Sequence, residues 1–301
     1  PGGEKMLCIE VKEKQIEELV EKDQSLELLA GKEDGLIFTE GPIWNQKEQS
    51  FIFSDIAGNK MYQWNDEKGL SVFANYSFKA NGNAMDSQGN VISCEHATSR
   101  IARRDGDGSN YEVLCTHYEG KELNSPNDVI VKSNGDIYFT DPHFGRNPSK
   151  VGVERKRQLS FHGVYCLSKG NLFLEEKELE IPNGLCFSAD EKKLFINDSV
   201  NKLIKVYDVT EEGRLQNGKT WAVTQGDGVG LPDGMKLDMN ENLYCCAQGG
   251  IHIFNKEGLF LGRIVFPGQV ANLCFGGPDG KEIFICAVDK VYRIKGKVKG
   301  L

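Results

Sequence analysis

Several features typical of other protein classes are missing from this 301-residue chain. No apolar run approaches the roughly 18 residues of a membrane-spanning helix, so no membrane partner is expected. The formal net charge is -8, which argues against a nucleic-acid partner. The nine cysteines form no Cys-x-x-Cys pair, and most lie in apolar, strand-like runs. Buried free thiols are therefore expected rather than a disulfide framework.

The start of the chain, Pro1-Gly2-Gly3-Glu4, has no initiator methionine and no charged-then-apolar leader pattern. Together with free thiols this favours a cytoplasmic protein, while earlier removal of a leader peptide stays open. A helical pattern occurs only near residues 10–22, where Ile16, Leu19 and Val20 share one face. Residues 1–24 are therefore predicted to form an N-terminal extension with room for a short helix.

After residue 36 the chain repeats one pattern. Each unit has a polar residue, usually followed by glycine, then an apolar run, a turn with Asp, Asn or Gly, and a second apolar run. The six units begin at Glu40, Asn81, Asn127, Asn183, Asp233 and Asn272. Most continue into a third strand, and units of roughly 40–50 residues with four strands are typical of β-propeller blades.

The predicted fold class is therefore all-β: a six-bladed β-propeller with four-stranded blades, formed by residues 1–301 as one domain. The alternative, a two-domain β-sandwich, gives no reason for six similar units. The last unit shows only three strands. The segment Ser25–Leu29 is available as the fourth, so an N-terminal strand is predicted to close the ring and to leave no open sheet edge.

The six leading residues all carry a side-chain carboxylate or amide. Equivalent positions on inner strands converge on the axis of a propeller, so these groups are expected to face one small space. Oxygen ligands without imidazole or thiolate suit a hard divalent cation. The alternative is that Asn and Asp before glycine are ordinary turn residues, although Glu40 would be an unusual one.

Seven motifs carry a family resemblance. They are TEGPIW at 39–44, FSD at 53–55, CEH at 94–96, LNSPNDVIVKSNGDIYFTDPHFG at 123–145, IPNGLCFSADEKKLFIND at 181–198, LPDGMKLD at 231–238 and ANLCFGGPDGKEIFI at 271–285. In this order they resemble the gluconolactonase branch of the senescence-marker-protein, gluconolactonase and luciferin-regenerating family. The resemblance implies a six-bladed propeller that hydrolyses lactones and binds one divalent cation, with calcium expected first and magnesium, zinc or manganese as alternatives. Relatives hydrolyse organophosphorus esters.

Matched residue by residue, the resemblance makes Glu40, Asn183 and Asp233 metal ligands. Asn127 matches a position that is a ligand in some relatives and faces the substrate in others, so it is both a metal and a catalytic candidate. Animal members use an Arg and an Asn of the second unit for sugar hydroxyls. Here that unit supplies Asn81 and Asn83 as substrate-binding candidates, but no Arg stands beside them.

Lactone hydrolysis needs an activated water, and Asp233 is the best candidate for the base. It is one of only two carboxylates among the six leading residues; the alternative is that it serves only as a ligand. His96 is a catalytic candidate, as a donor to the oxyanion or to a substrate hydroxyl. His143 and Arg146 are substrate-binding candidates, and for His96 and His143 a purely structural role is the alternative.

The sequence thus predicts a metal-dependent hydrolase that opens a small lactone, acting as a monomer or small homo-oligomer on a small-molecule substrate. Two alternatives stay open. One is a related esterase or phosphotriesterase, because the pocket rim sets substrate choice. The other is a non-catalytic, calcium-binding propeller.

Overall fold

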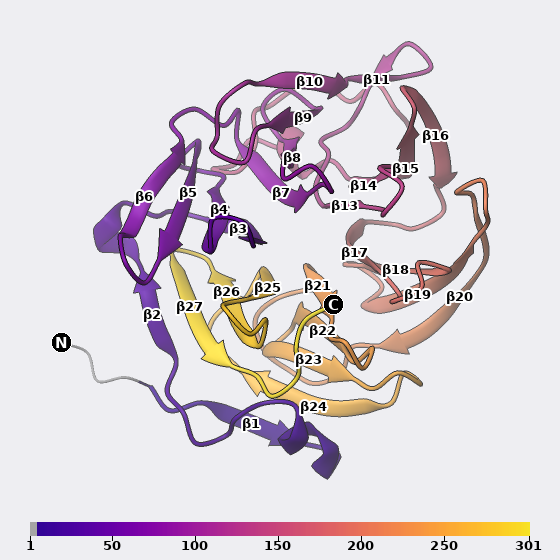
Figure 1. Cartoon of the computed structure of the whole chain (residues 1–301). Helices are drawn as coiled ribbons and strands as arrows, with labels where there is room; N and C mark the ends of the chain where they lie inside the picture. Colours follow the sequence, from indigo (N-terminus) through magenta and orange to yellow (C-terminus); the bar gives the residue numbers. More distant parts are fainter. Residues whose placement is uncertain (1–4) are drawn as a thin grey trace.

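The computed structural model describes residues 5–301, and it confirms the six-bladed propeller. Six antiparallel sheets stand around a central axis, each with its first strand innermost (Figure 1). The first five blades contain β3 (Thr39–Asn45) to β6 (Gly69–Ala74), β7 (Ala80–Met85) to β10 (Glu112–Cys115), β13 (Val129–Val131) to β16 (Asn171–Glu176), β17 (Pro182–Phe187) to β20 (Leu215–Val223), and β21 (Met235–Leu237) to β24 (Phe260–Val265).

The middle strands of these blades are β4 (Ser50–Asp55), β5 (Lys60–Asn65), β8 (Val91–Glu95), β9 (Arg100–Arg104), β14 (Ile137–Asp141), β15 (Gly163–Ser168), β18 (Lys193–Asp198), β19 (Leu203–Val209), β22 (Leu243–Ala247) and β23 (Gly250–Phe254). A small hairpin of β11 (His117–Tyr118) and β12 (Lys121–Glu122) follows the second blade. Short 3-10 turns are η2 (Lys32–Asp34) and η3 (Phe144–Arg146).

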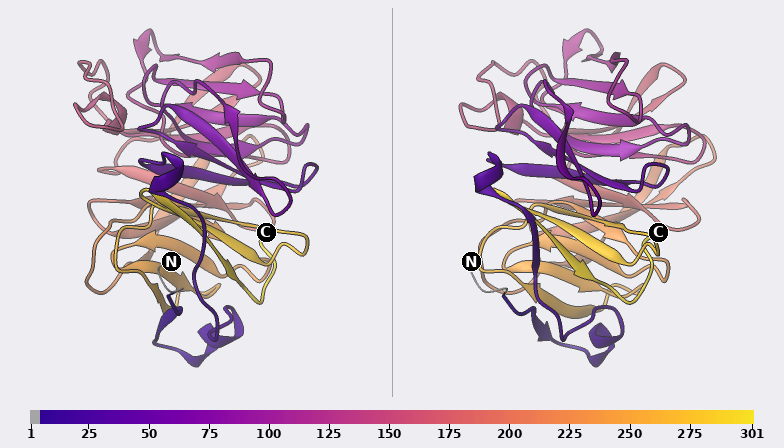
Figure 2. Two further views of the ribbon diagram at one scale, coloured as in Figure 1. Left: turned by 90° about the vertical axis from the view of Figure 1, so that its left-hand side faces the viewer. Right: turned by 60° about the vertical axis from the view of Figure 1, so that its left-hand side comes forward.

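The sixth blade closes the ring with strands from both ends of the chain. β25 (Asn272–Gly276), β26 (Glu282–Ala287) and β27 (Lys290–Lys295) come from the C-terminal region, and β2 (Glu27–Ala30) is the outermost strand. β2 pairs antiparallel with β27, with Glu27 opposite Arg293. Figure 2 shows this indigo strand lying along the yellow blade. The predicted closure is confirmed, with the strand slightly later than residues 25–29.

The segment before β2 differs from the expected helix. Strand β1 (Cys8–Val11) pairs with β24 and becomes the fifth strand of the fifth blade. One 3-10 turn, η1 (Lys14–Glu18), lies between β1 and β2. The apolar residues Ile16, Leu19 and Val20 are nonetheless buried, because they join the cluster formed with the fifth and sixth blades. Burial of these side chains, rather than helix propensity, therefore decides the conformation of the segment.

The apolar core lies mainly between neighbouring blades. Between the first and the sixth, Phe51, Phe53 and Phe284 stack with ring centroids 4.6–5.0 Å apart. All nine cysteines are free, and eight are buried. No helix within residues 5–301 is long and apolar enough to cross a membrane. The rigid packing between blades leaves the polar ends of the inner strands to converge at the axis.

Candidate active site

Five of the six leading residues meet in one pocket at the axis. Glu40, Asn81, Asn127, Asn183 and Asp233 line a cavity of about 640 Å³, together with His96. They come from five different blades, at or just before the inner strands β3, β7, β13, β17 and β21. The sixth, Asn272, lies behind Glu40 and donates a hydrogen bond from Nδ2 to Glu40 Oε1 at 2.9 Å.

The glycines that follow these polar residues allow the blades to approach one another. A Cβ on Gly41 would lie 2.0 Å from the Asn81 carbonyl oxygen, and one on Gly184 would lie 2.0 Å from the Asp233 carbonyl oxygen. Gly82 and Gly234 are equally tight against the next blade. Glycine is therefore required where two inner strands touch. The close contacts at these glycines bring the preceding polar side chains of neighbouring blades together. Ordinary turn formation therefore does not explain why a polar residue followed by glycine recurs in the units.

Hydrogen bonds connect the amides around the pocket. Asn81 Nδ2 donates to Asn127 Oδ1, and Asn127 Nδ2 donates to Asn183 Oδ1 at 3.0 Å. Asn183 Nδ2 donates to Ser199 Oγ at 3.1 Å, and Ser199 Oγ–H donates to the Pro232 carbonyl at 2.6 Å. The chain of bonds runs in one direction, which fixes the amide oxygens of Asn127 and Asn183 relative to the axis.

The two carboxylates have unusual electrostatics. Burial and the negative charge of Asp128 raise the pKa of Glu40 to about 7. Burial and the neighbouring Glu40 raise the pKa of the Asp233 carboxyl well above its ordinary value. No Lys or Arg lines this pocket among residues 5–301. The pocket therefore brings two acidic side chains into surroundings that disfavour their charged forms.

The other predicted residues have different surroundings. Asn83 is buried behind the pocket, where its Nδ2 donates to the Gly41 carbonyl and its Oδ1 accepts from Ser93. The His143 and His162 rings are hydrogen-bonded at 2.9 Å outside the pocket lining. Arg146 is buried, and its guanidinium donates to the carbonyls of residues 123, 124 and 156 and to the Glu122 carboxylate. The structure brings none of these three into the pocket.

One side of the pocket is apolar, and sequence reasoning largely missed it. The wall consists of Phe38, Ile56, Phe144, Val151, Leu231 and Pro232. These residues precede inner strands or lie in loops outside the repeated pattern, so the repeat gave no signal for them. Two clues were available in the sequence: the Leu231-Pro232 pair immediately before Asp233, and Phe144 beside His143 in the motif at 123–145.

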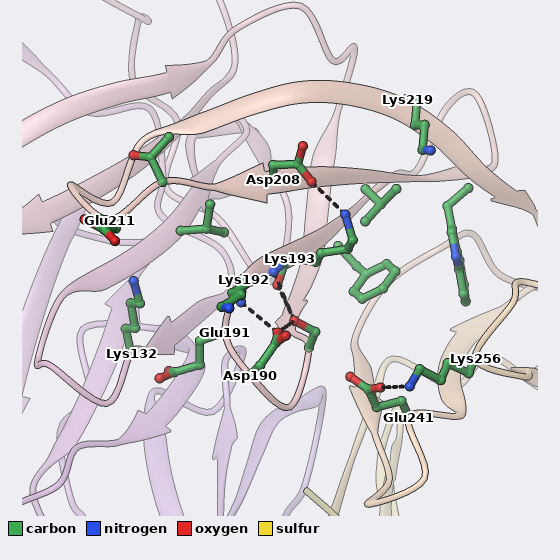
Figure 3. A pocket seen from close by; sticks show the side chains of 16 residues that line it. Lys132, Asp190, Glu191, Lys192, Lys193, Asp208, Glu211, Lys219, Glu241 and Lys256 are labelled. Atoms are coloured by element: carbon green, nitrogen blue, oxygen red, sulfur yellow. Dashed lines mark hydrogen bonds and ion pairs between the residues drawn. The ribbon is translucent and has the colours of Figure 1, made fainter.

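A larger surface hollow of about 940 Å³ lies away from the axis, over the fourth and fifth blades. Figure 3 shows its lysines and carboxylates, with Lys193 paired to Asp208 and Lys256 to Glu241. These charges are mostly solvent-exposed and neutralise one another. Size alone therefore does not identify the site. The axial pocket has the buried, convergent and perturbed groups that are typical of functional sites.

Comparison with known proteins agrees with this architecture. The chain is 34% identical over 286 residues to a gluconolactonase from Zymomonas mobilis, covering 87% of this chain and 80% of that protein. It is 24% identical to the pentonolactonase XacC of Haloferax volcanii, covering 82% and 80%. A solved gluconolactonase structure from Xanthomonas campestris superposes with a TM-score of 0.88 at 29% identity, covering 98% of this chain and 97% of that one.

A calcium-binding regucalcin structure from Agrobacterium tumefaciens has the same fold, with a TM-score of 0.75 at 16% identity and coverage of 92% and 95%. Residues 38–289 match the family described as the SMP-30/Gluconolactonase/LRE-like region. That match includes all six repeated units and every residue of the axial pocket. The chain belongs to the SMP-30/gluconolactonase family.

Proposed function

We propose that this protein is a metal-dependent hydrolase that opens a small lactone. The observation that carries the proposal is the convergence of two carboxylates and three amides on one pocket that no Lys or Arg of residues 5–301 lines. The relatives named gluconolactonase and pentonolactonase support a lactone as substrate. We also propose a cytoplasmic location, because all nine cysteines are free.

The donor set fits a divalent cation. Glu40, Asn127, Asn183 and Asp233 would hold it, and all four offer the oxygen ligands that hard cations prefer. Burial and neighbouring carboxyls raise the pKa of both acidic groups, and a bound cation would favour their charged forms. A bound cation would act as a Lewis acid on the lactone carbonyl. We propose calcium first, supported by the relatives named regucalcin.

Asp233 is proposed as the base. Its carboxylate takes a proton from a water whose oxygen bonds to the lactone carbonyl carbon. The bond between the carbonyl carbon and the ring oxygen then breaks, and the leaving ring oxygen takes the proton back from Asp233. The product is an open-chain hydroxy acid, with atoms and charge balanced at each step. The alternative is that Asp233 only holds the cation.

The proposal is tested by a pH-indicator assay over sugar lactones, an aromatic lactone and a phosphotriester. Each is assayed with chelator and after restoring calcium, magnesium, zinc or manganese. We expect lactone opening that chelator abolishes and one cation restores. Preference for the aromatic lactone or phosphotriester would favour the related hydrolase. Tight metal binding without any hydrolysis would favour a non-catalytic propeller.

A matched pair of variants tests the role of Asp233. Asp233→Asn keeps an oxygen donor but removes the base, so turnover at saturating metal should fall by about 10²–10⁴. Glu40→Gln also removes one carboxylate charge but no proposed proton acceptor. Its loss should appear as weaker metal affinity in calorimetry and recover at high metal concentration. Full recovery of both variants would mean that Asp233 is only a ligand.

A further inference from the structure

The two ring nitrogens of His96 have fixed and different partners. Nδ1 lies 2.9 Å from the Val151 carbonyl oxygen, and Nε2 lies 3.0 Å from Asn81 Nδ2. A main-chain carbonyl can only accept a hydrogen bond, so Nδ1 must carry the proton. In the neutral ring Nε2 is then an acceptor, and the amide nitrogen of Asn81 must face it.

The opposite end of the hydrogen-bond chain fixes the same orientation. The Pro232 carbonyl can only accept, so Ser199 donates to it and accepts from Asn183 Nδ2. Asn183 Oδ1 then accepts from Asn127 Nδ2, which leaves Asn127 Oδ1 facing Asn81. Two independent carbonyls, on opposite sides of the pocket, therefore require the same orientation of the Asn81 amide.

This orientation leaves one atom without a partner. Asn81 Nδ2 donates both of its hydrogens, to His96 and to Asn127. Asn81 Oδ1 is buried and accepts no hydrogen bond from residues 5–301. A buried acceptor without a partner is costly, and a donor supplied by a ligand would remove that cost.

We propose that His96 is a positioning residue that holds the Asn81 amide with Oδ1 ready to accept a hydroxyl of the substrate. This rests on the proposed lactone-hydrolase function. It replaces the predicted direct donation by His96 to the oxyanion or to a substrate hydroxyl, since both ring nitrogens are occupied. His96 is only 1% exposed, and burial lowers the pKa of its imidazole to about 4. The imidazole is therefore neutral at physiological pH, as its acceptor role requires.

His96 also connects Asn81 to the pocket wall. Val151 belongs to the loop between β14 and β15 that supplies Phe144 to the apolar side. Arg155 of the same loop donates hydrogen bonds to the His96 carbonyl and to the Gly145 carbonyl at 3.2 Å. The His96 imidazole thus links the loop between β14 and β15 to Asn81, whose Oδ1 is the proposed hydroxyl acceptor.

The tautomer is measured by ¹⁵N NMR of the metal-free protein, which needs no activity. The chain has five histidines, so the His96 resonances are assigned by comparison with a His96→Asn variant. We expect a protonated Nδ1 and an unprotonated Nε2, unchanged between pH 5.5 and 8. A protonated Nε2, or titration in this range, would overturn the proposal even if the protein hydrolyses lactones.

Two substitutions separate the two hydrogen bonds of His96. His96→Gln places an amide oxygen near the position of Nε2 and can still accept from Asn81. His96→Asn places its amide near Nδ1 and keeps only the Val151 bond. For a polyhydroxylated lactone, we expect kcat/KM to fall about tenfold in His96→Asn and to stay within about threefold in His96→Gln.

The substrate and a double variant complete the test. For δ-valerolactone, which has no hydroxyl, the loss of kcat/KM in His96→Asn should be clearly smaller than for the polyhydroxylated lactone, because Asn81 Oδ1 has no hydroxyl to accept. His96→Asn combined with Asn81→Ala should be no worse than Asn81→Ala alone. Equal losses in both His96 variants on both lactones would show direct catalysis by His96 and refute positioning. A protein that hydrolyses neither lactone would refute the proposed function, while the NMR result would still stand.

Discussion

The close approach of neighbouring inner strands predicts a large effect from a single methyl group. In Gly184→Ala the new Cβ would lie 2.0 Å from the Asp233 carbonyl oxygen and 2.9 Å from Asn197 Nδ2. An ordinary contact needs more than 3.4 Å, so the fourth and fifth blades must move apart by more than 1 Å. The moving carbonyl accepts a 2.6 Å hydrogen bond from Asn197 Nδ2, which the shift would disrupt.

The expected cost follows from these contacts. Overpacking against rigid backbone costs about 1–3 kcal/mol, and a lost hydrogen bond adds about 1 kcal/mol. The free energy of unfolding should therefore fall by about 2–4 kcal/mol, measured from the urea midpoint. Because Asn183 and Asp233 flank this contact, calorimetric metal affinity should fall as well.

Gly268→Ala is the matched control. No atom lies within 4 Å of its added Cβ, and its backbone conformation suits any residue. Its unfolding free energy should stay within about 0.5 kcal/mol of wild type. If Gly184→Ala unfolds at the wild-type urea concentration and binds metal equally well, close blade contact does not organise the site.

Two further predictions concern stability. Deleting residues 1–30 removes β2 and the buried Ile16, Val20 and Leu26, a loss of several kcal/mol out of the roughly 5–15 kcal/mol that stabilise a domain. The truncated chain should melt far below the full chain, and equal melting temperatures would disprove closure by β2. The full chain itself should unfold in one transition if residues 1–301 are one domain. Burial lowers the pKa of His252 from 6.5 to about 4, so the unfolded state binds a proton that the folded state rejects. Stability should therefore fall as pH drops from 6.5 to 4, by up to about 3 kcal/mol from this residue, and His252→Gln should show a shallower fall in urea titrations.

The sequence was sufficient to predict the architecture because the fold is periodic. Each blade of this chain has a polar residue at or just before its inner strand, so six such residues predicted six blades. The closing strand was predictable because the sixth unit showed only three strands and needed a fourth. The N-terminal segment was not: Ile16, Leu19 and Val20 have a helical spacing, yet they pack onto neighbouring blades from a 3-10 turn and its continuation. Tertiary burial outweighed local periodicity there.

For the candidate site, the sequence predicted which residues lie at the axis better than it predicted what each side chain contacts. The repeat selected six leading residues, and the family resemblance selected four of them as ligands. The pocket contains all four, which are Glu40, Asn127, Asn183 and Asp233. Arg146 was chosen by residue type alone. Its neighbours in space include main-chain carbonyls, which carry no sequence signal, and the guanidinium is occupied by them. The same limit applies to Asn83, whose partners lie in adjacent strands.

The distinction between repeated and unrepeated residues also separates two properties of the pocket. The proposed ligands begin the repeated units, and their spacing is set by glycine contacts between blades, so any change there alters both the fold and the cation site. The apolar wall comes from Phe38, from the loop that contains Phe144 and Val151, and from Leu231 and Pro232. None of these residues sets the contact between inner strands. Substrate preference can therefore change through the wall while the axial groups stay fixed, which is why the axial residues indicate a reaction but not a particular lactone.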